Sequence, residues 1–198
     1  MCFLALSADG YIARADGDVA WLDRPGTAGD YGMAEFYASV DTVLLGRKTW
    51  ELGKKLGQTS FPGKKNFVFS RTIEPSPESE GEREGEVEVV REDPGEFASR
   101  LKKTKGESIW MVGGAGLIAS FLDAGQIDEL ILHVIPILLG EGIPLVEPRR
   151  RDVPLDLVSS RGFADGSVQL HYAVRPARAA EAVPRVPADR VRPRARKR

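Results

Sequence analysis

Two short glycine motifs, each directly after an apolar run, constrain the fold of this chain most. Gly46-Arg47-Lys48-Thr49 follows Thr42-Val43-Leu44-Leu45, and Gly113-Gly114-Ala115-Gly116 follows Ile109-Trp110-Met111-Val112. Each pattern predicts a buried strand, a tight turn and the start of a helix. A helix N-terminus presents unpaired N–H groups and the positive end of the helix dipole, so each turn suits a phosphate. Two such turns on one sheet fit a dinucleotide.

Basic and hydroxyl side chains accompany these turns. Arg47 and Lys48 can neutralise phosphate charge, and the Thr49 hydroxyl can donate a hydrogen bond. Ser70-Arg71 follows a third apolar run, and a hydroxyl beside a guanidinium would favour NADP(H) over NAD(H). Each group alone is also explained by a helix cap or a surface turn. Together they support one ligand, because open α/β sheets bind ligands at their strand ends.

A Rossmann-type site is the alternative dinucleotide interpretation. Residues 114–119 match the G-x-G-x-x-A pattern, which requires an acidic residue about 20 positions later, at the end of the next strand. Asp128 and Glu129 come too early, and Glu141 lies in a glycine-rich turn. We therefore rank this interpretation lower.

The remaining pattern predicts one α/β domain over residues 1–175. Its sheet is expected to be mostly parallel, with an antiparallel C-terminal hairpin around Asp165-Gly166. A long loop is expected at 8–30, followed by a helix capped by Asp30, and a further helix is expected to begin at Asp93-Pro94. Strands are predicted at 2–7, 42–45, 66–69, 87–90, 109–112 and 130–139, a turn at 140–144, the hairpin strands near 154–163 and 167–174, and helices at 47–54 and after Gly116.

Composition limits the class of protein and its partners. Residues 176–198 hold eight basic and two acidic residues and predict a disordered basic tail, which leaves the domain acidic and argues against nucleic-acid binding. The single cysteine, Cys2, allows no internal disulfide and fits a reducing compartment. The apolar start is too short for a signal peptide, and no run reaches the length of a membrane helix. We expect a cytoplasmic protein without a membrane partner.

The motifs taken together resemble the dihydrofolate reductase-like superfamily. Within it, the chain is most similar to the reductase domain of the bifunctional riboflavin-biosynthesis deaminase/reductase and its stand-alone relatives. The resemblance covers about residues 3–175. It rests on Leu6-Ser7-Ala8-Asp9-Gly10-Tyr11-Ile12-Ala13, Asp30-Tyr31-Gly32, Leu45-Gly46-Arg47-Lys48-Thr49-Trp50, Phe69-Ser70-Arg71, Val112-Gly113-Gly114-Ala115-Gly116-Leu117 and Pro136-Ile137-Leu138-Leu139-Gly140-Glu141-Gly142.

The resemblance implies a three-layer fold, a homodimer and NADPH as cofactor, without a metal. The Gly113–Gly114 peptide bond is expected to be cis, as is common in the superfamily. The implied cofactor-binding residues are Ala5, Ile12, Gly46, Arg47, Lys48, Thr49, Ser70, Arg71, Val112, Gly113, Gly114, Ala115, Gly116, Leu117 and Ile118.

Reduction also needs a proton, for which Asp30, Glu35 and His133 are candidates. Asp30 aligns with the acidic residue of dihydrofolate reductases and is our predicted catalytic residue, although a helix cap explains it equally well. A core histidine is the favoured interpretation of His133. The predicted substrate-binding residues are Asp30, Phe36, Trp50 and His133.

The expected substrate is a pyrimidine- or pteridine-type heterocycle. The best single prediction is 5-amino-6-(5-phosphoribosylamino)uracil, the substrate of the riboflavin reductases. Residues 1–45, however, contain only Arg14 and Arg24 as arginines, and hence no evident second cluster for its phosphate. Dihydrofolate reductase activity and a non-catalytic NADP(H)-binding protein are the alternatives.

Overall fold

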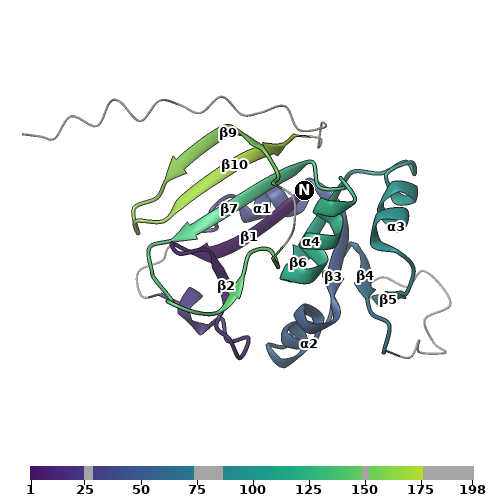
Figure 1. Cartoon of the computed structure of the whole chain (residues 1–198), viewed down its shortest axis with the longest axis horizontal. Helices are drawn as coiled ribbons and strands as arrows, with labels where there is room; N and C mark the ends of the chain where they lie inside the picture. Colours follow the sequence, from purple (N-terminus) through teal and green to yellow (C-terminus); the bar gives the residue numbers. More distant parts are fainter. Residues whose placement is uncertain (25–28, 74–86, 149–151, 176–198) are drawn as a thin grey trace, which may run out of the picture.

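An eight-stranded sheet forms the centre of the computed structural model, which describes residues 1–24, 29–73, 87–148 and 152–175. The strands are β1 Cys2–Ser7, β3 Val40–Gly46, β4 Lys65–Phe69, β5 Val87–Val90, β6 Ser108–Gly113, β7 Glu129–Ile135, β9 Leu155–Gly162 and β10 Val168–Val174. Their order is β5-β4-β3-β6-β1-β7-β10-β9 (Figure 1). The first six are parallel, and β10 and β9 form the antiparallel hairpin at one edge. The predicted sheet is confirmed.

Helices cover both faces of this sheet and complete three layers. The helices are α1 Met33–Ala38, α2 Arg47–Lys55, α3 Pro94–Leu101 and α4 Ala115–Asp123. Phe97 of α3 and Phe121 of α4 pack with Leu44 and Met111 on one face. Phe36 of α1 and Trp50 of α2 belong to the second cluster, on the opposite face. Figure 1 shows α4 in front of the strands and α1 behind them.

Local sequence signals explain where several elements begin and end. The Asp93 carboxylate accepts hydrogen bonds from the backbone N–H groups of Gly95 and Glu96 at 2.8 and 3.1 Å, and Pro94 opens α3 as predicted. Gly125, with φ +65°, follows the end of α4. The central strand β3 is apolar and buried, as expected of a parallel strand covered on both faces.

Three predicted boundaries were wrong. The expected loop at 8–30 contains a short strand, β2 Tyr11–Ala13, and a 3₁₀ turn, η1 Ala20–Leu22. β2 pairs with β8 Ile143–Pro144, so the expected turn at 140–144 ends in a strand. The strand expected at 130–139 stops at Ile135, because Pro136 has no N–H to donate to the ladder.

Asp9 holds the chain that follows β7. Its carboxylate accepts hydrogen bonds from the Ser7 hydroxyl and from the N–H groups of Leu139 and Gly140, at 2.6, 3.1 and 2.7 Å. These contacts, that of Ser7 foremost, lower the pKa of Asp9. They tie the β1–β2 turn to the 136–142 segment.

No helix in the described ranges has the length and hydropathy of a membrane span. The predicted basic tail, 176–198, lies outside the described residues.

Candidate active site

The two glycine turns lie against each other, because β3 and β6 are neighbours in the sheet. A Cβ at Gly46 would lie 3.4 Å from both the Gly113 oxygen and the Gly114 nitrogen. A Cβ at Gly114 would lie 3.2 Å from Oγ1 of Thr49. The Gly113–Gly114 bond is cis, as the resemblance predicted. Side chains at these positions would crowd the junction, so glycine keeps it open.

Both helices that follow these turns begin without a side-chain cap. The N-cap residues are Gly46 for α2 and Gly114 for α4, and neither has a side chain that could accept from the first turn. Two helix N-termini with available N–H groups therefore lie at one edge of the sheet. Arg47 lies in the first turn of α2 and pairs with Glu51 at 2.8 Å, next to the exposed Lys48. This edge is suited to a pyrophosphate.

Ser70 and Arg71, the third pair of residues predicted to bind a phosphate, do not present a hydroxyl and a guanidinium side by side as expected. The buried hydroxyl of Ser70 accepts hydrogen bonds from the N–H groups of Thr72 and Ile73, at 3.2 and 3.0 Å. Ser70 therefore shapes the turn, and Arg71 is its exposed cation.

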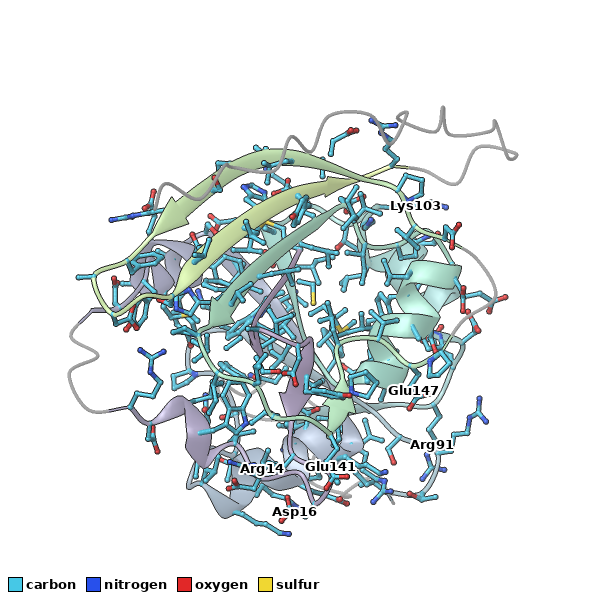
Figure 2. All side chains as sticks on the ribbon, turned by 60° about the vertical axis from the view of Figure 1, so that its left-hand side comes forward. Arg14, Asp16, Arg91, Lys103, Glu141 and Glu147 are labelled. Carbon is cyan, nitrogen blue, oxygen red and sulfur yellow. The ribbon has the colours of Figure 1, made fainter. Side chains whose placement is uncertain are left out.

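Arg91 joins Arg71 at this edge, because β5 is parallel to β4 and ends beside it. The Ser70 N–H donates to the Val90 carbonyl at 3.0 Å, and the Arg91 guanidinium donates to the Ile73 carbonyl at 2.7 Å. Arg91, labelled in Figure 2, was missed in the sequence because it follows an acidic segment rather than a glycine turn.

Ile118, one of the predicted cofactor-binding residues, packs in the core at the start of α4. Its side chain is fully buried in the α3–α4 core, and its N–H donates to the Gly114 carbonyl at 3.0 Å. Ile118 thus secures the first turn of α4, and its role in cofactor binding stays a prediction.

A carboxylate that the sequence did not single out lies at the start of α4. A Cβ built on Gly116 would come within 2.9 Å of Oε1 of Glu147, so this carboxylate lies directly against the first turn of the helix (Figure 2). The positive end of the helix dipole favours a negative charge in this place. Glu147 therefore occupies the surroundings of the predicted pyrophosphate site.

Four neighbouring strands form a floor beside the glycine turns, on the α1 side of the sheet. Ala5 lies opposite His133 in the β1–β7 register. Leu45 and Val112 lie in the same cluster as Phe3 and Ile131, and side chains alternate along a strand, so Ala5 and His133 share their face. The floor runs His133, Ala5, Val112, Leu45 across β7, β1, β6 and β3. Three strand spacings give it a length of roughly 14 Å.

The His133 end of the floor is aromatic and polar. His133 is 5% exposed, and its ring lies 4.4 Å from that of Tyr31 and 5.3 Å from that of Phe163. Neither ring nitrogen of His133 has a hydrogen-bond partner among the described residues. Burial lowers the pKa of His133, so the imidazole is neutral at pH 7 and carries one donor and one acceptor.

Asp165, in the β9–β10 turn, organises this end. Its carboxylate accepts hydrogen bonds from Ser167 and from the Tyr31 hydroxyl, the latter at 2.9 Å. Arg24 donates to the Asp165 carbonyl at 2.7 Å. These partners, Ser167 first, lower the pKa of Asp165 to about 2. Sequence reasoning treated Asp165 only as a turn residue, since Tyr31 and Arg24 come from segments more than 130 positions away.

Asp30 does not join this cluster. Its carboxylate is exposed and accepts hydrogen bonds from the N–H groups of Gly32 and Ala34, at 3.0 and 3.1 Å, which lower its pKa. The N-cap residue of α1 is Gly32, with φ +82°, so the predicted cap position was wrong by two residues, but Asp30 still accepts from the N–H groups at the start of the helix. An exposed carboxylate with a lowered pKa is a poor proton donor, so the catalytic role of Asp30 stays a prediction without structural support.

Phe36 and Trp50, the other two predicted substrate-binding residues, lie in different surroundings from each other. Phe36 is buried between Phe3 and Trp110, with ring distances of 4.6 and 5.3 Å, and has a packing role. Trp50 lies at the Leu45 end of the floor, where its Nε1 donates to the Thr59 carbonyl at 2.9 Å. There it lines a cavity of about 170 Å³ together with Leu45, Thr49 and Val112. A larger hollow of about 420 Å³ lies at the opposite edge, beside Met1, and contacts none of these residues.

The fold and this edge define a dihydrofolate reductase-like domain with a site suited to a dinucleotide. Comparison with known proteins agrees. A crystal structure of a putative riboflavin biosynthesis protein from Shewanella sp. PV-4 superimposes with a TM-score of 0.75 at 27% identity, covering 88% of this chain and 98% of that one. Dihydrofolate reductase from Enterococcus faecalis, complexed with NADP(H), shares the fold at 17% identity and a TM-score of 0.62, over 88% and 95% of the two chains.

The family model of the RibD C-terminal domain matches residues 1–168, so this chain belongs to that family. The uncharacterized protein YwjB of Bacillus subtilis (strain 168) is 40% identical over 171 residues, which cover 86% of this chain and 94% of YwjB. The predicted resemblance is confirmed, and membership supports an oxidoreductase.

Proposed function

We propose that this protein is an NADPH-dependent reductase of a planar nitrogen heterocycle of the pyrimidine or pteridine type, working in the cytoplasm. The observation that carries the proposal is the junction of Gly46 with Gly113–Gly114, which aligns the uncapped N-termini of α2 and α4. Backbone N–H groups there would hold the pyrophosphate, with Arg47, Lys48 and Thr49 beside them. Arg71 and Arg91 would pair with the 2′-phosphate.

The nicotinamide would lie over Ala5 and supply the hydride. The chain's own contribution is to bind, to orient and to keep water out. His133, next to Ala5 in the register, would hydrogen-bond the polar edge of the heterocycle with whichever ring nitrogen faces it. The neutral buried imidazole would donate a hydrogen bond to charge that develops on the substrate, and solvent would supply the proton, since Asp30 is exposed and ionised.

Cofactor binding is the first experiment. NADPH and NADH are titrated into the full chain and into Arg71→Ala, Arg91→Ala and Arg71→Ala/Arg91→Ala, with cofactor fluorescence as the readout. We expect NADPH to bind more tightly than NADH, and the preference to shrink in each single variant and to vanish in the double variant. Arg100→Ala is the matched control, since Arg100 is an exposed arginine of α3 that pairs with Glu92. Failure of both cofactors to bind wild-type protein would refute the proposal.

Turnover separates the two alternative functions. Oxidation of NADPH by dihydrofolate would identify a dihydrofolate reductase. Binding of NADPH with no oxidation by any pyrimidine or pteridine would leave a non-catalytic nucleotide-binding protein. Oxidation by 5-amino-6-(5-phosphoribosylamino)uracil would place the chain with the riboflavin reductases.

A further inference from the structure

The cavity at the Leu45 end of the floor is apolar and preformed. None of its eleven lining residues has a charged side chain, and the apolar ones include Leu45, Trp50, Leu52, Leu56, Phe61 and Val112. Its volume of about 170 Å³ is close to that of apolar cavities that hold benzene, which are about 150 Å³. Leu56, one of the lining residues, is 67% exposed.

Hydrogen bonds fix the wall of the cavity formed by residues 58–61. Trp50 donates to the Thr59 carbonyl, and the Gln58 N–H donates to the Gly53 carbonyl at 2.8 Å. The Phe61 N–H donates to the buried side chain of Asn66, also at 2.8 Å. A wall held by these contacts needs no ordering when a ligand enters, so the cavity is a preorganised subsite.

The cavity is continuous with the proposed active site. Thr49 contacts both, since its Oγ1 lies beside Gly114 and its side chain lines the cavity. Leu45 and Val112 belong to the floor that ends at His133, roughly 14 Å away across three strand spacings. The floor thus has a hydrogen-bonding end at His133 and an apolar end at Trp50.

Building on the proposed reductase function, we propose that the substrate carries an uncharged apolar substituent, of about the size of a benzene ring, that binds in this cavity. A phosphoribosyl group is the wrong chemistry for it, because transfer of a phosphate to an uncharged apolar lining loses hydration without a compensating partner. The Lys54 ammonium, which lies 3.8 Å from the centre of the Trp50 ring, is exposed to solvent, and Lys54 is not among the lining residues.

Two matched aminouracils test this inference. The full chain is titrated calorimetrically with 5-amino-6-benzylaminouracil and with 5-amino-6-(5-phosphoribosylamino)uracil, each with and without NADPH. We expect the benzyl compound to bind about tenfold or more tightly than the phosphoribosyl compound, from burial of its ring. Equal affinity, tighter binding of the phosphoribosyl compound, or no binding of the benzyl compound would overturn the inference.

Substitutions of two exposed leucines, Leu56 and Leu138, test the cavity directly. Leu56→Asp puts a charge at the cavity and should weaken the benzyl compound about tenfold while NADPH binding stays unchanged. Leu138→Asp is the matched control, because Leu138 is 74% exposed and lines no part of the cavity. An unchanged benzyl affinity in Leu56→Asp would also contradict the inference. Loss of NADPH binding by wild-type protein would instead refute the reductase proposal, so the two failures are distinguishable.

Discussion

The ring of Tyr31 lies 4.4 Å from the imidazole of His133, and its hydroxyl donates a hydrogen bond of 2.9 Å to Asp165. Tyr31 has a positive φ of +53°, an uncommon conformation for a side chain of this size. Gln169 donates to its carbonyl at 3.1 Å and helps to hold it there. Three distant segments are thereby fixed around one buried histidine.

Tyr31→Phe should separate the contribution of the Tyr31 hydroxyl to stability from that of its ring. The ring would still cover His133, while Asp165 would lose one of its donors. We expect the melting temperature to fall by about 2–4 °C, the shift typical of one modest interaction in a domain of this size. Tyr37→Phe is the control, since the Tyr37 hydroxyl donates to a carbonyl in an exposed position. An equal or larger loss in the control would contradict the role assigned to Tyr31.

The lowered pKa of His133 should be visible in the pH dependence of stability. Burial lowers its pKa below the unfolded value of 6.5, so the unfolded chain binds the proton more readily. The neutral histidine therefore costs no stability above pH 6.5, and stability falls as the pH drops through 6.5 toward the folded pKa. Melting curves of wild type and His133→Leu between pH 8 and 5 measure this difference.

His133→Leu should remove that part of the acid sensitivity without loss of stability at pH 8. Replacing an unpartnered imidazole with an apolar side chain leaves no buried polar group unsatisfied. Heterocycle turnover should nevertheless fall at least tenfold. If the melting temperatures of the two proteins changed with pH in the same way, the assignment of the acid sensitivity to His133 would be contradicted.

Glu147 should weaken cofactor binding, because its carboxylate shares the start of α4 with the proposed pyrophosphate site. A charge near a helix N-terminus contributes about 0.3–1 kcal/mol, so Glu147→Gln should bind NADPH about 2–5-fold more tightly. The gain should shrink at high salt. Glu141→Gln, which changes another exposed glutamate of the same segment, should have no such effect. A weaker affinity in Glu147→Gln would show that the carboxylate assists the cofactor.

The exposed edge strand β9 is our proposed contact between two copies of this chain. All eight of its residues are exposed, including Leu157 and Val158 at 58% and 57%. Two antiparallel copies centred between Val158 and Ser159 would place Asp156 opposite Arg161 of the partner subunit. Leu157→Lys should turn a dimer into a monomer in sedimentation velocity, and Leu138→Lys should not. A monomeric wild type would refute the proposal.

Sequence alone determined the individual apolar strands and the two glycine turns, because neighbouring residues specify each of them. Apolar runs such as Thr42-Val43-Leu44-Leu45 predict buried strands. Asp93-Pro94 likewise predicts a helix start from its own residue types. The resemblance added the three-layer fold, while the order of the strands was established by the structure.

Only the tertiary structure decided which side chains share the site. Asp30 satisfied the sequence pattern of an acid, but its nearest donors are the N–H groups of its own helix start. The contacts of Asp165 with Arg24 and Tyr31 have no local signal, because they form only when the C-terminal hairpin pairs with β7. Burial likewise turned Ile118 into a core residue and left His133 without a partner among the described residues. Local patterns specify backbone, whereas chemistry depends on long-range packing.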